Sequence, residues 1–329
     1  MVAPVRADAA AVRSDDTDTQ RSDRVVCEKD TAGQDIVKVS SDRPGPTTRR
    51  CRVPACGPVV FRARQHREQR HRVVHGTLAS ADISGFTKLA ERLAGDGKVG
   101  GENLTFALNE VFTLLIDEAQ ALGGDILKFG GDALLILFDG DDHARRAVVA
   151  AARMQNAIES DRAREAAAGI ALRMSVGAHT GPIDLFLVGD DHRELIVAGP
   201  GATETARLED SAEAGMVLVD EPGVEALGAD VADHAATAER DDGGIVIDRE
   251  SAAALEAAAP PAVDAPPPSG SALPESLRTQ VAAIEEIGGE HRRATVGFVR
   301  FQGIDERVAA GDVDAVVDDL DNLVSRTTE

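Results

Sequence analysis

The chain has 329 residues, of which 43% are hydrophobic, and its formal net charge at pH 7 is −22. This length allows two domains of ordinary size, and the negative charge argues against nucleic acid or a membrane surface as a main partner, because both attract basic proteins. The 3 cysteines follow no regular spacing, which argues against a disulfide framework and leads us to expect a cytoplasmic protein. No apolar run is long enough to span a bilayer, and the N-terminus shows no secretory signal pattern.

Hydrophobic periodicity begins late in the chain. Residues 1–70 are polar and patternless, and we predict a disordered N-terminal tail there. A strand is predicted from Val73 to the glycine turn at Gly85, and a short amphipathic helix follows as far as Gly95. A longer helix is predicted over 102–124, where paired glycines stop it.

The middle of the chain predicts hairpins. Two short apolar strands, at 125–129 and 132–138, flank Gly130-Gly131, which is a hairpin signal. A helix follows over 141–159 with Asp142 as its N-cap. The remaining predicted elements are strands at 169–181, 182–190, 194–199 and 216–220 and a helix at 201–215. Hairpins in place of repeated βαβ units predict an α+β sandwich, with helices covering a mostly antiparallel sheet.

The last part of the chain repeats the start of this folded region. We predict a domain over 71–249, a Pro- and Ala-rich linker over 250–276, and a second unit over 277–329. The sequence of the second unit predicts a strand, a glycine turn and a helix, in the same order as at the start of the first domain. One strand and one helix cannot bury their own apolar face, so we expect the rest of this unit to follow Glu329.

Two aspartates stand where apolar strands meet glycine turns. Asp82 ends the first strand, within ADISGFT, and Asp132 stands at the hairpin, within FGGDALL. Two such carboxylates with a backbone carbonyl can place two Mg²⁺ ions on a triphosphate. The segment 84–87 turns into a helix N-terminus, whose free N–H groups suit phosphate oxygens. Taken singly, each aspartate is more typical of an ordinary turn or cap, but the pair in these apolar contexts favours a metal site.

These motifs resemble the catalytic domain of class III nucleotidyl cyclases. ADISGFT and GGDILKFGGDALL carry the resemblance, and VGAHTGPI, AGPGATETARL and AGMVLVDE continue it in order over Val73 to Leu227. The sequences of these motifs are most similar to those of the first catalytic domain of bicarbonate-responsive, soluble-type adenylyl cyclases. The resemblance implies a ferredoxin-like, palm-type sandwich and a second, paired cyclase domain, of which residues 277–329 would be a partial copy.

The resemblance implies roles for individual residues. Asp82 and Asp132 match the two metal-binding aspartates, with the carbonyl of Ile83 as a further ligand for two Mg²⁺ or Mn²⁺ ions. The implied nucleotide-binding residues are Ile83, Ser84, Gly85, Phe86, Thr87 and Gly131. The implied substrate is ATP, with GTP left open, and the implied partner is a second cyclase domain in the same chain or in a homodimer.

Lys128 and Arg207 match two functional cations of the family. In homodimeric cyclases the lysine reads the adenine and the arginine stabilises the transition state, whereas in bicarbonate-responsive first domains the pair forms an activator anion site. From the residues alone, Lys128 is more typical of a solvated strand and Arg207 of an ion pair on a helix surface. Thr203 and Ile196 stand where homodimeric cyclases have an asparagine and a purine-reading residue, which favours the anion-site assignment.

The expected activity is conversion of ATP to cyclic AMP and pyrophosphate by two-metal catalysis, in signal transduction. In the second unit Arg300 matches Asp82, so this unit is expected to donate no metal ligand there. The alternative is a catalytically degenerate cyclase domain used for nucleotide or anion sensing or for dimerisation. GGDAL also resembles the diguanylate cyclase signature, but Ala133 replaces the acid that binds metal in that family.

Overall fold

The computed structural model describes residues 8–10, 25–29, 35–39, 70–94, 97–189, 193–228, 244–257 and 298–328. The chain forms two compact units. One contains Gly57–Leu187 and Leu195–Pro267, and the other contains Met1–Cys56, Val188–Glu194 and Pro268–Glu329. Among the described residues, no helix combines the length and hydrophobicity needed to cross a membrane.

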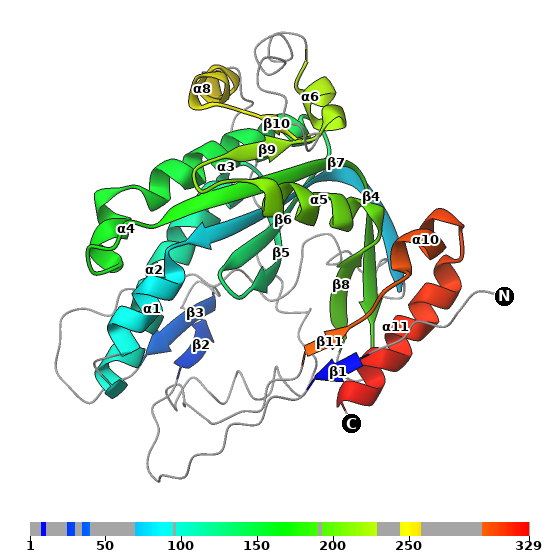
Figure 1. Ribbon diagram of the computed structural model, residues 1–329, viewed down its shortest axis with the longest axis horizontal. Coiled ribbons are helices and arrows are strands. Elements are labelled where there is room, and N and C mark those ends of the chain that lie inside the picture. The colour runs from blue at the N-terminus through cyan, green and yellow to red at the C-terminus, as the bar shows by residue number, and fades with distance from the viewer. Residues whose placement is uncertain are drawn as a thin grey trace. The chain divides into compact units, whose positions relative to one another are not determined.

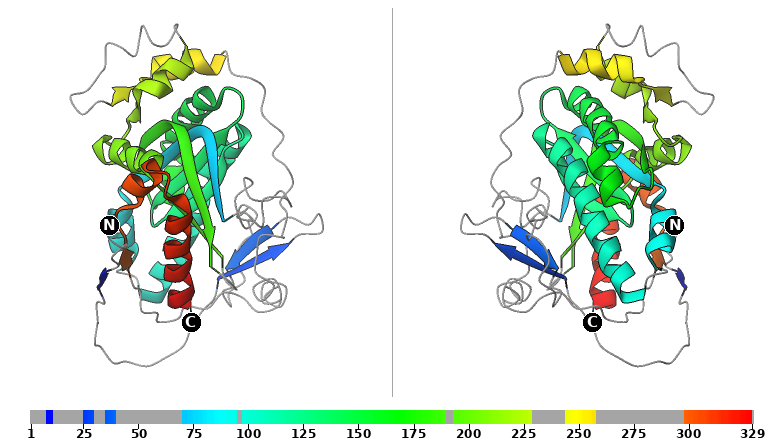
Figure 2. Two further views of the ribbon diagram at one scale, coloured as in Figure 1. Left: turned by 90° about the vertical axis from the view of Figure 1, so that its right-hand side faces the viewer. Right: turned by 90° about the vertical axis from the view of Figure 1, so that its left-hand side faces the viewer.

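A seven-stranded sheet forms the centre of the larger unit (Figure 1). Its strands are β4 (His71–Ser84), β5 (Asp125–Gly130), β6 (Ala133–Asp139), β7 (Arg173–Val188), β8 (Glu194–Ala198), β9 (Val217–Val219) and β10 (Ile245–Val246). The order is β10-β9-β7-β4-β6-β5, and β8 also pairs with β7. The pairs β4–β6, β4–β7, β5–β6 and β9–β10 are antiparallel, and β7–β9 is parallel. β4 and β7 are long strands, with 14 and 16 residues, and they pair with each other in the middle of the sheet (Figure 2).

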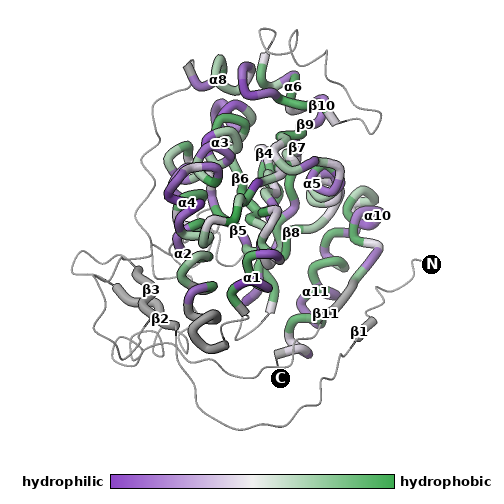
Figure 3. The backbone as a smooth tube through the Cα atoms, turned by 60° about the vertical axis from the view of Figure 1, so that its left-hand side comes forward, coloured by the Kyte–Doolittle hydropathy of each residue, from purple (hydrophilic) through white to green (hydrophobic). Residues whose placement is uncertain are grey.

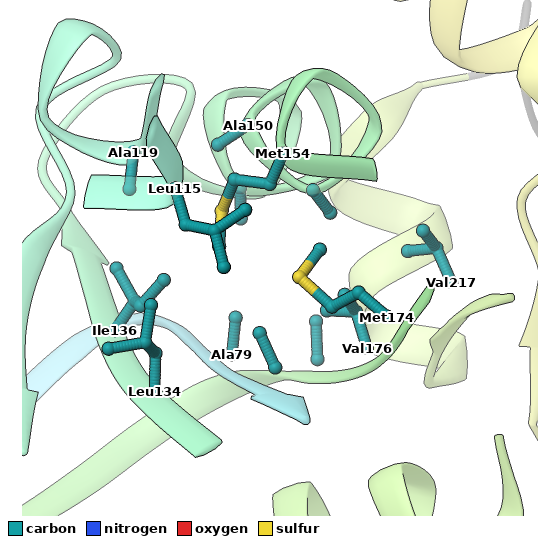
Figure 4. Packing of buried hydrophobic residues seen from close by; sticks show 14 of the residues in the cluster. Ala79, Leu115, Ala119, Leu134, Ile136, Ala150, Met154, Met174, Val176 and Val217 are labelled. Atoms are coloured by element: carbon teal, nitrogen blue, oxygen red, sulfur yellow. The ribbon is translucent and has the colours of Figure 1, made fainter. Parts of the chain in front are cut away.

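The helices of this unit pack on the sheet or on one another. They are α1 (Phe86–Ala94), α2 (Gly97–Ala121), α3 (His143–Ile158), α4 (Asp161–Ala166), α5 (Pro200–Ser211), α6 (Glu221–Leu227) and α8 (Arg249–Ala257). Successive strand residues face opposite sides, so Ala79, Ala81 and Ile83 of β4 join the core beneath the helices. Leu115 of α2 and Met154 of α3 meet the sheet in this core (Figure 4). The strands of this sheet are accordingly mostly hydrophobic, whereas α2 and α3 alternate between hydrophilic and hydrophobic residues (Figure 3).

The opposite face of the sheet carries a smaller core and α5. Leu78 of β4 and Leu185 of β7 are buried there, and Ala202 of α5 packs against them. α5 comes so close to β7 that a Cβ atom on Gly177 would lie 2.2 Å from the backbone nitrogen of Glu209. Glycine is therefore required where this helix crosses the strand.

The smaller unit repeats one motif of the larger. In it, β11 (Phe298–Arg300), α10 (Ile304–Ala309) and α11 (Val313–Thr328) follow each other, just as β4, α1 and α2 do. Gly303 before α10 has φ +84°, and Gly85 before α1 has φ +98°. The two segments therefore share an element order and a left-handed glycine, and the interpretation of residues 277–329 as the start of a second cyclase domain stays a prediction. The other described elements here are β1 (Asp8–Ala10), which pairs with β11, and the hairpin of β2 (Val25–Lys29) and β3 (Asp35–Val39).

The structure confirms the predicted α+β class with its mostly antiparallel sheet. It also differs from the predicted elements, because α4, α6 and β10 were not predicted. β7 is one continuous strand through Pro182, where the sequence predicts a break. Asp142 stands at the N-cap of α3, but its φ is +54° and its side chain caps nothing.

Two further differences concern the predicted linker and the predicted N-terminal tail. Helix α8 covers the start of the predicted linker, because Ala252 and Leu255 are buried in the core. The strands β1, β2 and β3 fall within the predicted disordered tail. The division of the chain at 71–249, 250–276 and 277–329 stays a prediction.

Candidate active site

The first acidic residue stands at the end of the central strand. In the antiparallel register Asp82 of β4 lies opposite Ala133 of β6 on one side and Ser175 of β7 on the other. Two residues later the strand ends, because Gly85 takes φ +98°, which L-residues with a side chain rarely adopt. Helix α1 starts there, and the N–H of Leu89 donates to the carbonyl of Gly85 at 3.2 Å. This turn therefore sets a carboxylate beside a helix N-terminus.

The second acidic residue reaches the same place through the β5–β6 hairpin. Gly131 takes φ +72°, and nothing lies within 4 Å of the position of a Cβ atom there. Asp132 follows it and precedes Ala133, which is the partner of Asp82 in the sheet. The register of the hairpin thus brings the two predicted metal ligands together from residues fifty positions apart.

The two carboxylates interact electrostatically. Burial raises the pKa of Asp82 above its ordinary value of 3.8, the charge of Asp132 raises it further, and a hydrogen bond from the Ile83 N–H opposes the rise. A divalent cation would relieve this repulsion, so the donor set fits a hard metal ion. In the described segments, no three histidine, cysteine or acidic side chains group closely enough to hold a metal. A metal here would therefore need backbone or substrate oxygens as well.

Replacing Asp82 with asparagine is expected to stabilise the metal-free protein at neutral pH. Folding raises the pKa of Asp82, so its ionised form destabilises the fold above that pKa. The gain from Asp82→Asn is therefore present at neutral pH and disappears as the pH falls through the folded pKa towards 3.8. Solvent screens this partly exposed group, so we expect about 0.5–1 kcal/mol in urea unfolding with EDTA. Lower stability of Asp82→Asn at pH 7.5 would contradict the repulsion.

The predicted nucleotide-binding segment lies beside these carboxylates. Ser84, Gly85 and Phe86 are half-buried, and Thr87 is exposed at the start of α1. The first N–H groups of a helix have no partner within the helix, so they can receive phosphate oxygens. The geometry is consistent with the predicted role of this loop, which stays a prediction.

Lys128 lies on the same face of the sheet as Asp82. In β5 it stands opposite Leu135 of β6, and Leu135 stands opposite Ser80 of β4. Ser80 and Asp82 are two residues apart on one strand, so their side chains share a face. The structure therefore places Lys128 on the face that also carries α5.

Arg207 lies on α5 and is engaged by a neighbouring carboxylate. Its Nε donates to Oε2 of Glu204 at 2.9 Å, and its Nη2 donates to Oε1 at 2.6 Å. The side chain of Arg207 is 38% exposed and that of Glu204 is 33% exposed. The ion pair that the sequence indicated for Arg207 is thus present. Thr203, in the position of the family's asparagine, is exposed.

Glu209 is a further acidic residue near this site, and it was not predicted from the sequence. Burial raises the pKa of Glu209, and the charges of Asp82, Asp210 and Asp132 raise it further, while a hydrogen bond from the Ser175 side chain lowers it. Glu209 therefore adds a third carboxylate near the two aspartates, although the three do not form a metal-binding group of their own. The only signal in the sequence was an acid two residues after Arg207, and its proximity to β4 depends on how α5 crosses Gly177.

Comparison with known proteins identifies the class. A family model described as "Adenylate and Guanylate cyclase catalytic domain" matches residues 68–243, and the chain belongs to this family. This membership favours the nucleotidyl cyclase interpretation of the GGDAL motif over the diguanylate cyclase interpretation.

The chain is also similar to individual proteins. The chain is similar to adenylate cyclase type 10 of Mus musculus, with 30% identity over 138 residues, which are 40% of this chain and 8% of that protein. It is also similar to a membrane guanylyl cyclase of Dictyostelium discoideum, with 30% identity over 152 residues, which are 44% of this chain and 10% of that protein. The chain thus spans a tenth or less of the length of these relatives. The crystal structure of the adenylyl cyclase CyaB from P. aeruginosa has 27% identity and a TM-score of 0.42, covering 48% of this chain and 82% of that one.

Proposed function

We propose that the larger unit is the metal-donating half of an adenylate cyclase, which converts ATP to cyclic AMP and pyrophosphate. The observation that carries this proposal is the meeting of Asp82 and Asp132 at one end of the sheet, beside the N-terminus of α1. A pair of mutually repelling carboxylates next to free helix N–H groups suits a metal-bound triphosphate.

The proposed reaction is an intramolecular displacement. The ribose 3′-oxygen forms a bond to the α-phosphorus, and the bond from that phosphorus to the pyrophosphate oxygen breaks. When bound, two Mg²⁺ or Mn²⁺ ions would favour ionisation of the 3′-hydroxyl and neutralise the phosphates. Asp82, Asp132 and the Ile83 carbonyl would hold them. The N–H groups of 85–87 donate to phosphate oxygens, and Gly131 leaves room for the triphosphate.

A partner domain would complete the site. Thr203 and Ile196 lack the polar groups that the family uses on the opposite side of the nucleotide, so we propose that a second cyclase domain, in the same chain or another, supplies them. Lys128 and Arg207 are then proposed as an anion site, with bicarbonate as the candidate activator. The cytoplasm is the proposed location, which the lack of a disulfide framework and the use of ATP support.

A second candidate function is nucleotide or anion sensing without catalysis. The observation in its favour is that Thr203 is exposed where the family has an asparagine, while Glu204 occupies Arg207. Both observations argue against an active site that a homodimer of this domain could complete by itself.

Calorimetry and product assay together separate the two candidates. We expect the chain to bind ATP only with Mg²⁺ or Mn²⁺, and to form cyclic AMP when a complete second cyclase domain is added. Metal-dependent ATP binding without any cyclic AMP would support the sensing function instead. Parallel titrations with GTP test the substrate, and tighter binding and turnover of GTP would overturn the assignment of ATP.

A further inference from the structure

Glu204 and Arg207 form a bidentate ion pair. Two parallel bonds join the Nε and Nη2 edge of the guanidinium to the two carboxylate oxygens, at 2.9 and 2.6 Å. A carboxylate is a planar O–C–O group, and bidentate pairing of this kind is the strongest arrangement that arginine makes with such a group. Glu204 therefore occupies, from within the helix, the edge that a planar oxyanion would use.

We propose that Glu204 is a built-in competitor that controls anion binding at Arg207. A bicarbonate ion presents the same O–C–O fork as the Glu204 carboxylate, so both compete for one edge of the guanidinium. An anion binds there only when Glu204 moves away, and its apparent affinity falls accordingly. This inference rests on the proposed role of Arg207 as an anion-binding residue.

The surroundings hold the competitor in place. Thr205 and Leu208 of α5 are 1% and 0% exposed, so the helix is fixed to the sheet, and residues 204 and 207 lie one turn apart on its outer surface. A tethered carboxylate has a high effective concentration at its arginine, unlike a free anion from solution. Glu209 and Asp210 add negative charge on the same helix, and this charge further disfavours the binding of an anion from solution at Arg207.

The simpler interpretation is that this pair only supports the helix. Exposed i,i+3 pairs stabilise helices by a few tenths of a kcal/mol and have no effect on ligands. Such a role predicts no change in anion affinity when the charge of Glu204 is removed, so the two interpretations give different results.

The test follows the Arg207 side chain directly, without nucleotide. The full chain is labelled with ¹⁵N in arginine, the Nε–H resonance of Arg207 is assigned by its loss in Arg207→Lys, and sodium bicarbonate is titrated at constant ionic strength. Glu204→Gln keeps the side-chain length and removes the charge. Asp161→Asn is the matched control, because Asp161 stands three residues before Arg164 at 3.8 Å in another helix.

We expect the bicarbonate midpoint of Glu204→Gln to be about tenfold lower than that of the unchanged chain, and that of Asp161→Asn to be unchanged. Glu204→Ala should behave as Glu204→Gln does, which separates loss of charge from any local distortion. Equal midpoints for the unchanged chain and both Glu204 variants would overturn the proposal, and so would a lack of response at Arg207 in all of them. Neither result bears on cyclic AMP formation, and a failure to form cyclic AMP would leave the competition at Arg207 intact.

Discussion

Gly177→Ala is expected to lower the free energy of unfolding by about 3 kcal/mol, because the added methyl group collides with backbone and not with a movable side chain. The Cβ atom would lie 2.2 Å from the nitrogen and 2.7 Å from the Cα of Glu209. The methyl group can fit only if α5 lifts from β7. That movement would displace Arg207 and Glu209 together, so nucleotide-dependent functions should fall with stability. Chemical unfolding followed by circular dichroism measures the loss.

Gly130→Ala is the matched control for this prediction. Its Cβ atom would meet only the Cβ of Ala133, at 3.9 Å, and its φ is not in the left-handed region. The change should therefore alter the free energy of unfolding by less than about 1 kcal/mol. A Gly177→Ala protein as stable as the Gly130→Ala protein would show that α5 does not cross β7 as described.

Arg146→Met is expected to destabilise the larger unit by about 4 kcal/mol, because Arg146 is buried and satisfies three backbone carbonyls. It is 6% exposed. Its Nε donates to the carbonyl of Asp141 at 3.1 Å, its Nη1 to that of Leu122 at 3.0 Å, and its Nη2 to that of Asp139. Methionine fills much of the volume but donates nothing, so the end of α2 and the end of β6 would keep unpaired carbonyls.

A second arginine on α3 provides the comparison. Arg153 makes an ion pair with Glu256 at 2.8 Å, with side chains 33% and 44% exposed. Pairs of this kind contribute little, so Arg153→Met should lower the free energy of unfolding by less than about 1 kcal/mol. Similar losses for Arg146→Met and Arg153→Met would contradict the assigned role of Arg146. Thermal unfolding of both variants in one buffer gives the comparison.

Local patterns were enough to predict the acidic pair. Asp82 follows an apolar strand and precedes a glycine turn, and Asp132 follows two glycines between two strands. Each signal is contained in a few residues, and antiparallel pairing of β4 with β6 then brings the carboxylates together. The ion pair of Arg207 was equally local, because Glu204 lies one helical turn before it.

Features that depend on tertiary packing were not predicted. Glu209 belongs to the acidic site only because α5 crosses β7 at Gly177, and nothing in the helix sequence marks that crossing. The Gly181-Pro182 pair indicated a break, but β4 pairs with β7 on both sides of it and keeps the strand continuous. The sequence of helix α8 is rich in alanine, like that of the predicted linker, and its membership of the core depends on its packing against α3.

Helix α6 was not predicted, although its first residues carry a local helix-start signal. Asp220 accepts hydrogen bonds from the N–H of Gly223 at 3.0 Å and of Thr180 at 3.2 Å, and its other oxygen pairs with Nδ1 of His179 at 2.6 Å. An aspartate followed by a proline in the first turn is a typical helix start. The sequence could therefore have predicted the cap, whereas the link from Asp220 to β7 required the structure.

We propose that Asp82 and Asp132 hold the metal ions for ATP cyclisation. The most direct test of this proposal is cyclic AMP formation by this chain mixed with a complete second cyclase domain, with Mg²⁺ or Mn²⁺, for the unchanged chain, Asp82→Ala and Asp132→Ala. We expect metal-dependent cyclic AMP formation that falls about a thousandfold in each variant, because each removes one of the two proposed carboxylate ligands. Metal-dependent ATP binding without cyclic AMP, unchanged in Asp82→Ala, would contradict the proposal.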